Sequence, residues 1–420
     1  MVAKKNKIEL IAGIDIGSTS IRMAIGKLAV DNSDDFNLQL VGLVEVPSEG
    51  VTKGIVSSIE EAVSSLSNSL EQAERLVGVP IEHAWVGISG QHVTSIKNKG
   101  VVAVAKSDGE IGEEDVARAI EAARAVSTPL NFEILHVLPR SFAVDGQLGI
   151  KDPIGMTGVR LEVDTQIIQG SSIHIKNLTK AVYRTGIDID DVVMSILAVG
   201  EVVTTARQRD LGVCVANIGS ATTSLVVYEE GEILHSVVLP IGSEHITNDL
   251  ALGLKSPIDI AERVKKEFGQ CVSDGLTKKD VLDLVNVGSE LSQEVSIKFV
   301  AEVIGARMEE ILEKIDQELS RLNRSRLLPA GIVFTGGGAK IPGLVELSKR
   351  VLELPSSLGY PLGVKSVSDK INDLSFGTAI GLVYWGSNLK QGNSRMSRLE
   401  LKNVSKASQR VRNWFKSLMP

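Results

Sequence analysis

The chain has 420 residues, of which 43% are hydrophobic and 4% aromatic, and its formal net charge is −7. A chain of this length can bury the cores of two or more domains, and its negative charge argues against general binding to nucleic acid. The longest uncharged stretch, residues 211–228, contains asparagine, serine, threonine and two glycines. It is therefore not the run of about 20 apolar residues that a membrane-spanning helix requires.

The first part of the chain predicts a β-hairpin, an amphipathic helix and then a separate block. The hairpin covers Ile8–Ile25, and Ser57–Val77 carries apolar residues at helical spacing. A strand is expected at His83–Ser89. Beyond it, residues 93–169 alternate strands with one helix, Glu113–Val126. We interpret this block as an α+β insert in the first domain.

The second part of the chain repeats the opening pattern and then becomes mainly helical. We expect a strand at Val192–Leu197, a helix at Gly200–Gln208 and a second hairpin at Gly212–Tyr228. Residues 242–322 carry mostly helical patterns, and Gly377–Gly386 is expected to form a last buried helix.

Three glycine-bearing loops follow apolar runs that are predicted to be strands: Gly13–Ser20, Asn217–Thr223 and Thr335–Gly338. A strand, a tight turn and a second strand direct backbone N–H groups into the bend, and such concavities bind anions. The first two loops share their pattern at a separation of roughly 200 residues, which indicates duplicated halves around one cleft. Taken singly, each loop is explained at least as well by a turn that needs glycine. The pattern is neither a P-loop nor a dinucleotide-binding fingerprint.

The three loops resemble the phosphate-1, phosphate-2 and adenosine motifs of the actin/heat-shock chaperone/sugar-kinase superfamily. Within it, the chain resembles the FtsA family of bacterial cell-division proteins over nearly its whole length. The stretches that carry this likeness are Ile134–Pro139, Gly149–Met156, Gly158–Glu162 and Gly242–Asp249. The resemblance implies an α/β, actin-like (ribonuclease H-like) fold of two domains, with an α+β subdomain inserted in domain 1 and a C-terminal amphipathic helix. It also implies that ATP and Mg²⁺ bind.

The resemblance further divides the chain into four subdomains, a linker and a tail. We expect residues 1–82 and 164–208 to form subdomain 1A, residues 83–163 the inserted subdomain 1C, residues 209–241 and 325–386 subdomain 2A, residues 242–324 subdomain 2B, residues 387–404 a flexible linker, and residues 405–420 a membrane-targeting helix.

Phosphate groups need N–H donors and a cation, and the loops offer both. The residues expected to bind nucleotide from the three loops are Gly17, Ser18, Thr19, Asn217, Gly219, Ser220, Thr222, Gly336, Gly337 and Gly338. Asp15 can accept hydrogen bonds from Mg²⁺-bound water, because Mg²⁺ keeps several waters and takes few carboxylates directly; a turn-capping aspartate is the alternative. The resemblance places Glu262 at the ribose hydroxyls and Lys265 beside the base. A solvated charged face explains that run equally well.

Two positions depart from the superfamily pattern. The second loop usually begins with an aspartate that helps to hold the metal water, whereas this chain has Asn217. The glutamine or glutamate that often orients the attacking water, at the head of a helix, is replaced by Ser195. Because phosphoryl transfer depends on positioning and electrostatics, we expect ATP to act as a conformational ligand that is hydrolysed slowly.

The C-terminal segment is basic and amphipathic. From Lys390 to the end the chain has eight basic residues and one acidic residue. In a helical projection apolar and aromatic residues gather on one face and basic residues on the other, with Arg412 at the border. The residues expected at the membrane are Arg410, Val411, Arg412, Trp414, Phe415, Lys416 and Leu418. This pattern is typical of an interfacial helix that binds anionic lipid, although a helix that docks on the body or on a partner shares it.

The resemblance implies a scaffold that forms filaments on the inner face of the cytoplasmic membrane, at the division septum, and tethers the tubulin-like protein FtsZ to it. Arg307 matches a position associated with the FtsZ C-terminal peptide, but an i,i+3 pair with Glu310 is an equal explanation. Other division proteins are expected to bind subdomain 1C, and nucleic acid is not an expected partner.

Three alternatives share the fold. An actin-like protein of type IV pilus assembly would lack the basic tail. A small-molecule kinase would need a catalytic base in the cleft. A chaperone ATPase would need a large C-terminal domain, and only about thirty residues follow the last predicted helix.

Overall fold

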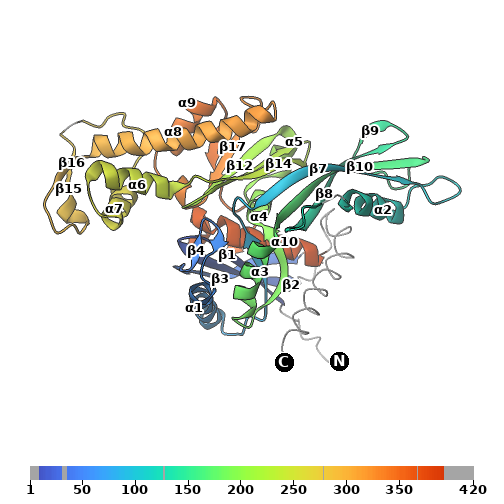
Figure 1. Cartoon of the computed structure of the whole chain (residues 1–420), viewed down its shortest axis with the longest axis horizontal. Coiled ribbons are helices and arrows are strands. Elements are labelled where there is room, and N and C mark those ends of the chain that lie inside the picture. The colour runs from blue at the N-terminus through green and yellow to red at the C-terminus, as the bar shows by residue number, and fades with distance from the viewer. Residues whose placement is uncertain (1–8, 31–35, 126–127, 278, 367, 392–420) are drawn as a thin grey trace.

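Two lobes built on separate sheets, with an insert at one side, make up the protein (Figure 1). The structure is a computed structural model and describes residues 9–30, 36–125, 128–277, 279–366 and 368–391. The predicted linker beyond residue 391 and the whole of the predicted tail, residues 405–420, lie outside these ranges. None of the helices in the described ranges combines the length and the hydropathy that a bilayer crossing requires.

The first lobe contains a six-stranded sheet in the order β11-β6-β1-β2-β3-β19. Strands β1, β2 and β3 form an antiparallel meander, and β6 and β11 run parallel to β1. The strands are β1 (Glu9–Ile16), β2 (Ser20–Val30), β3 (Phe36–Pro47), β6 (His83–Ile88), β11 (Asp188–Met194) and β19 (Lys365–Ser366).

The second lobe repeats this topology in a five-stranded sheet, β14-β13-β12-β17-β18. Strands β12, β13 and β14 form the meander, and β17 and β18 run parallel to β12. The strands are β12 (Val213–Ile218), β13 (Thr223–Glu229), β14 (Glu232–Leu239), β17 (Ile332–Thr335) and β18 (Ser356–Leu358). The duplication predicted from the first two glycine loops is confirmed.

Two helices, α4 (Ser195–Val203) and α10 (Gly377–Gln391), pack between the two sheets (Figure 1). Glycines allow their close approach: a Cβ on Gly13 of β1 would lie 2.5 Å from the carbonyl oxygen of Ala379, and one on Gly381 would lie 2.5 Å from that of Ala198. On the other side of the first sheet lie α1 (Ile59–Val77) and α3 (Ser172–Tyr183), which complete the core of the first lobe.

The secondary structure differs from prediction at the two central helices. Ser195–Leu197, predicted as strand, form the first turn of α4. The predicted helix at Gly200–Gln208 is divided, because Thr205 accepts a hydrogen bond from the backbone of Gln208 and starts a new helix, α5 (Ala206–Leu211). Helix α10 continues to Gln391, through five residues assigned to the linker. Buried Leu389 and the 2.7 Å ion pair between Lys390 Nζ and Glu9 Oε1 hold this last turn.

The insert is a four-stranded antiparallel sheet, β7-β10-β8-β9, with α2 (Glu113–Arg124) packed on one face over a separate small core. Its strands are β7 (Val93–Ala103), β8 (Phe132–Val144), β9 (Gln147–Ile150) and β10 (Arg160–Ser171). The predicted range 83–163 is displaced at both ends, because β6 pairs with β1 in the first lobe and β10 runs on to Ser171.

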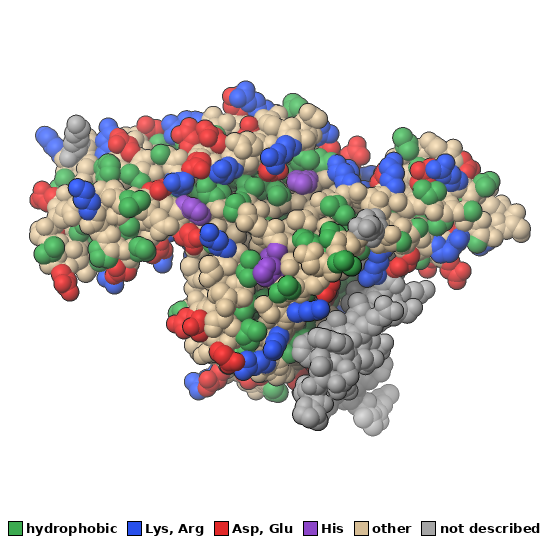
Figure 2. All heavy atoms as spheres, in the orientation of Figure 1, with side chains coloured by type: hydrophobic (Ala, Val, Ile, Leu, Met, Phe, Trp, Pro, Cys, Tyr) green, Lys and Arg blue, Asp and Glu red, His purple; other side chains and the backbone are tan. Residues whose placement is uncertain are grey.

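A mainly helical region completes the second lobe (Figure 1), and its buried residues form one core with those of the second sheet. It contains α6 (Ser243–Leu254), α7 (Ile258–Phe268), α8 (Ile297–Arg321) and α9 (Leu344–Leu352), with short strands β15 (Val281–Asp283) and β16 (Glu294–Ser296) and the 3₁₀ turn η1 (Leu284–Val287). On the face shown in Figure 2, acidic and basic side chains are interspersed over both lobes and the insert.

Candidate functional site

The two hairpin turns have the same geometry. The N–H of Gly17 donates to the carbonyl of Ser20 at 3.1 Å, and the N–H of Gly219 donates to that of Thr222 at 2.9 Å. The first turn follows β1, which pairs in parallel with β6, and the second follows β12, which pairs in parallel with β17. Each turn therefore lies at the carboxyl-terminal edge of the parallel strands of its sheet. That edge is where open α/β sheets bind ligands.

Both turns border one region between the lobes. The side-chain amide of Asn217 donates to Thr378 Oγ1 in the first turn of α10 at 3.2 Å. Its cross-strand neighbour, Ser224, lies with its Oγ 3.1 Å from the Oγ of Ser89, which follows β6 of the first lobe. The second hairpin therefore contacts both the end of a first-lobe strand and the helix that covers the first hairpin.

Two helices begin in this region. Ser195 opens α4 directly after β11, and its Oγ would lie 2.7 Å from a Cβ on Gly87 of β6. Helix α10 begins at Gly377, next to Thr378. The free N–H groups and the dipole of a helix start favour anions. Ser195 is only 3% exposed, and its Oγ has no hydrogen-bond partner among the described residues.

Asp15 lies in β1 opposite Arg22 of β2. Burial raises the pKa of Asp15 from its ordinary value of 3.8 to about 6, although the charge of Arg22 acts to lower it. Within the described residues there is no group of three acidic, histidine or cysteine side chains that could hold a metal. A single carboxylate suits Mg²⁺ held mainly through water, so Asp15 fits the predicted role.

The first loop is braced from outside by a small hairpin, β4 (Val51–Thr52) and β5 (Ile55–Val56). Ser18 Oγ accepts a 3.1 Å hydrogen bond from the N–H of Gly54 in the turn of that hairpin. The carbonyl of Thr19 accepts from the N–H of Ser48 at 3.1 Å. The hydroxyl hydrogen of Ser18 therefore remains able to donate to a ligand.

The second loop is joined to the start of α6. The carbonyl oxygens of Gly219 and Ser220 accept from the N–H groups of Ser243 and Glu244, each at 2.9 Å. Ser220 Oγ also donates to Glu244 Oε2 at 3.2 Å. The loop and the first turn of α6 thus form one rigid unit.

Lys265 of α7 reaches the same helix start. Its Nζ donates to the Ser243 carbonyl at 3.3 Å and to Thr247 Oγ1 at 2.8 Å, and it pairs with Glu262 Oε2 at 2.6 Å. Burial lowers the pKa of Lys265, and its side chain is 8% exposed. In Glu262, burial acts to raise the pKa, but the bonds from Lys265 and Thr247 outweigh it. The solvated-face alternative is thus wrong for Lys265, and the ribose and base roles of both residues remain predictions.

The third loop packs directly on the second. Gly336 has a φ of +90°, and a Cβ there would clash with Asn217 Oδ1. A Cβ on Gly338 would lie 2.5 Å from Ile218 Cγ2, whereas one on Gly337 would meet open space. Gly337 starts the 3₁₀ turn η2 (Gly337–Lys340) and is exposed. The loop therefore presents bare backbone beside the second hairpin.

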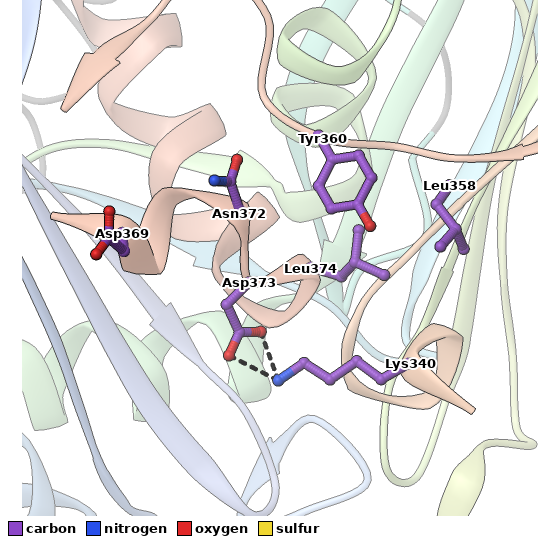
Figure 3. Close-up of a pocket in the computed structure, with 7 residues that line it drawn as sticks. All are labelled: Lys340, Leu358, Tyr360, Asp369, Asn372, Asp373 and Leu374. Atoms are coloured by element: carbon purple, nitrogen blue, oxygen red, sulfur yellow. Dashed lines mark hydrogen bonds and ion pairs between the residues drawn. The ribbon is translucent and has the colours of Figure 1, made fainter. Parts of the chain in front are cut away.

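An open pocket of about 470 Å³ lies beside the third loop (Figure 3). The residues that line it come from η2, from β18 and the chain after it, and from the turns η3 (Asp369–Asn372) and η4 (Leu374–Phe376). Lys340 Nζ pairs with Asp373 Oδ1 across the pocket at 2.5 Å. The carbonyl of Leu374, which also lines the pocket, accepts from the N–H of Gly336 at 3.1 Å.

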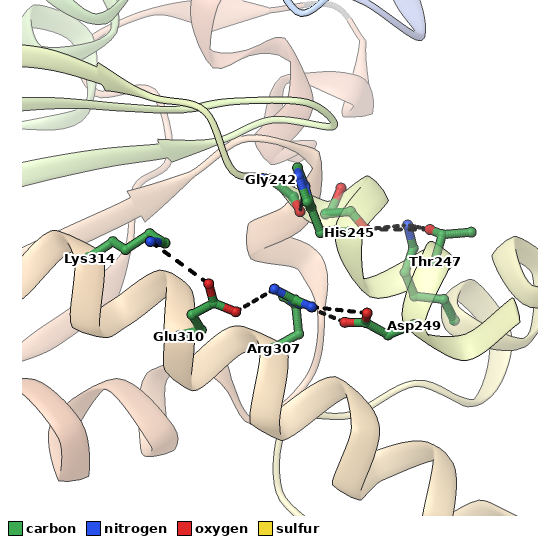
Figure 4. Close-up of polar contacts among 9 residues, drawn as sticks. Gly242, His245, Thr247, Asp249, Arg307, Glu310 and Lys314 are labelled. Carbon is green, nitrogen blue, oxygen red and sulfur yellow. Dashed lines mark hydrogen bonds and ion pairs between the residues drawn. The ribbon is translucent and has the colours of Figure 1, made fainter. Parts of the chain in front are cut away.

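Arg307 lies apart from these loops, on α8 (Figure 4). Its Nε and Nη2 donate to the two carboxylate oxygens of Asp249 on α6, at 2.6 and 3.0 Å. Nη1 pairs with Glu310, so the predicted i,i+3 pair is present. The bond with Asp249 raises the pKa of Arg307, and the side chain is 26% exposed.

The structure joins the second loop to the third loop and to the start of α6, which Lys265 also contacts, and it adds contacts that the sequence did not reveal. Thr378 and Ser89 were missed because their partners, Asn217 and Ser224, are 161 and 135 residues away along the chain. The pairing of Asp15 with Arg22 was within reach, since it follows from counting back from the turn of a hairpin. The membrane residues predicted at 410–418 lie outside the described ranges.

Two sheets of matching topology, each with an equivalent hairpin turn at the same edge, define an actin-like protein of two lobes. Solved structures with this fold include the PilM-PilN type IV pilus biogenesis complex, with a TM-score of 0.64 at 17% identity, covering 90% of this chain and 98% of that one. MreB5 of Spiroplasma citri bound to ADP has a TM-score of 0.53 at 12% identity, covering 92% and 99%. These likenesses show the fold.

Sequence comparisons identify the family. Residues 90–169 match the model described as SHS2 domain inserted in FTSA, and residues 214–381 match the model described as cell division protein FtsA. The cell division protein FtsA of Neisseria meningitidis serogroup B is 36% identical, covering 91% of each chain, and that of Bacillus subtilis strain 168 is 36% identical, covering 90% of this chain and 83% of the relative. The chain belongs to the FtsA family of cell-division proteins.

The raised pKa of Asp15 predicts a cost of the site to stability. Because burial favours the neutral acid, the stabilisation that Asp15 gives the folded state is fully present below the unfolded pKa of 3.8. It is lost as the pH rises through about 6 and the carboxylate becomes charged. We expect Asp15→Asn, free of nucleotide and metal, to be more stable than wild type at pH 7.5 by about 1–3 kcal/mol and equal to it near pH 4. Calorimetry in EDTA measures this, with exposed Asp152→Asn as control. A variant no more stable at pH 7.5 would contradict the prediction.

Proposed function

We propose that this protein is an ATP-binding, actin-like scaffold that assembles on the inner face of the cytoplasmic membrane at the division septum and tethers FtsZ to it. The observation that supports the proposal is the equivalence of the turns Gly17–Ser20 and Gly219–Thr222, together with the bond that ties the second hairpin, through Asn217, to the start of α10. A ligand that spans both turns is bound by both lobes, so its presence sets how far they close.

The residues present suit a nucleoside triphosphate. The turns supply backbone N–H groups, and the helix starts at Ser195 and Gly377 add a favourable field. The buried, unpartnered Oγ of Ser195 and the bare backbone at Gly337 leave room for polar ligand atoms. Mg²⁺, when bound, would neutralise phosphate charge, and Asp15 would hold its waters. MreB5 of Spiroplasma citri, which has the same fold, was solved bound to ADP, the diphosphate of such a nucleotide.

We infer that hydrolysis is slow, because two groups that serve phosphoryl transfer are lacking. Asn217 brings no negative charge and uses its amide on Thr378, and buried Ser195 has a short side chain. We expect purified protein in Mg-ATP to release phosphate at less than about 0.1 per second. A coupled phosphate-release assay measures this rate. Turnover of several per second would contradict the inference.

The membrane role depends on the C-terminal segment. We expect the full-length protein to form filaments on anionic lipid monolayers with Mg-ATP, and a version ending at residue 404 to form none. Many tails on one filament bind with avidity, whereas a single helix binds marginally. Electron microscopy and liposome pelleting measure both.

A matched pair of variants tests this helix itself. Trp414→Glu with Phe415→Glu places two negative charges on the apolar face and should abolish pelleting. Asn413→Glu with Ser417→Glu places the same charges on the polar face and should retain most of it. Equal pelleting by the two variants would count against membrane insertion.

We propose that the C-terminal peptide of FtsZ binds to the surface around Arg307. Its guanidinium is partly exposed and is held by Asp249, so it is oriented toward one face of α6 and α8. We expect Arg307→Glu to weaken binding of the FtsZ C-terminal peptide at least about tenfold. Lys314→Glu, two turns further along α8, changes the charge equally and should have little effect. Fluorescence anisotropy with labelled peptide measures both, and equal affinities would reject this surface.

A further inference from the structure

We propose, building on the nucleotide site above, that Arg22 is a phosphate-binding residue that leaves Glu45 for the polyphosphate when nucleotide binds. Arg22 is not part of any of the three glycine loops. Its role follows from its position on the sheet, from its buried surroundings and from the partners it has without ligand.

Arg22 faces the region between the lobes. The register aligns Gly87, Asp15, Arg22 and Glu45 across β6, β1, β2 and β3. Cross-strand partners point to the same face of a sheet. A Cβ on Gly87 would meet α4 and α10 at Ser195 Oγ and Leu382, so this face is the one that looks into the inter-lobe region.

The Arg22 guanidinium is held on this face by Glu45, and it retains a donor that has no partner among the described residues. Nη2 donates to Glu45 Oε1 at 2.6 Å, and the Arg22 side chain is 16% exposed against 36% for Glu45. Nε is buried and has no hydrogen-bond partner among the described residues. An unsatisfied buried donor beside a carboxylate is costly. A phosphate oxygen would satisfy it, because arginine binds phosphate through two donors at once.

The second lobe offers no equivalent cation. The matching row there consists of Thr335, Asn217, Ser224 and Val238. Its polar members are already bonded, Thr335 to the Leu374 carbonyl, Asn217 to Thr378 and Ser224 to Ser89. Among these eight positions, Arg22 is the one cation available to a bound polyphosphate.

Arg22 could instead serve only to neutralise Asp15. A purely structural counter-ion would alter stability without regard to the phosphates of a ligand. A phosphate-binding residue changes the affinity for ATP and ADP but not for adenosine. Removing the competing acceptor Glu45 then strengthens binding, which a structural role does not predict.

The experiment is calorimetric titration of the full-length protein with ATP, ADP and adenosine, with Mg²⁺ and with EDTA. We expect Arg22→Met to weaken ATP and ADP about 10- to 100-fold and to leave adenosine unchanged, with Arg22→Lys intermediate. Glu45→Gln should tighten ATP severalfold. Arg184→Met, which breaks an exposed arginine pair with Glu60 in the same lobe, should change nothing.

The outcomes separate this inference from the proposed function. Wild-type protein that binds none of the three ligands would reject both. Wild type that binds ATP, while Arg22→Met keeps the same ATP-to-adenosine ratio, would reject Arg22 alone. If Arg22→Met does not fold, Arg22→Lys and Glu45→Gln decide, and unchanged ATP affinity in both overturns the proposal.

Discussion

The fit of α10 between the two sheets is the constraint on which the whole site depends. At Gly13 and Gly381 the helix lies so close to β1 and α4 that a single methyl group would meet a carbonyl oxygen at 2.5 Å. Such overpacking strains a core. Because α10 is held this tightly to the first lobe, the bond from Asn217 to Thr378 fixes the second hairpin relative to the first. A more loosely packed helix would leave the position of the second hairpin relative to the first less well defined.

The two halves are alike in topology and unlike in charge. Asp15, Arg22 and Glu45 occupy the first row, whereas the second row is neutral and satisfied by its own hydrogen bonds. Burial raises the pKa of Asp15 to about 6, so its charged form destabilises the folded protein at neutral pH. Groups with pKa values perturbed in this way cluster at functional sites. The first lobe therefore carries the buried charges of the site, whereas the second lobe carries neutral side chains that are held by hydrogen bonds.

Local patterns predicted the hairpins, the insert and most helices well, because strand alternation and turn chemistry are properties of neighbouring residues. These patterns gave the wrong secondary structure, or missed a contact, where packing between residues far apart in the sequence determines the structure. Ser195–Leu197 are as apolar as a strand, but they form a helix that is buried between the lobes. Likewise, nothing near Asn217 in the chain reveals Thr378, and Lys390 looked like linker because its partner, Glu9, is 381 residues away. The site's residue types were predictable, but its hydrogen-bond partners were not.

In the sequence the insert lies between two strands of the first sheet, β6 and β11. In the structure, however, its strand β7 lies against β14, the edge strand of the second sheet (Figure 1). Lys151 Nζ also donates to the Glu230 carbonyl, beside that edge, at 2.8 Å. An uncovered edge strand invites pairing with a strand from another molecule. By lying over β14, the insert leaves this edge less accessible to a strand from another molecule.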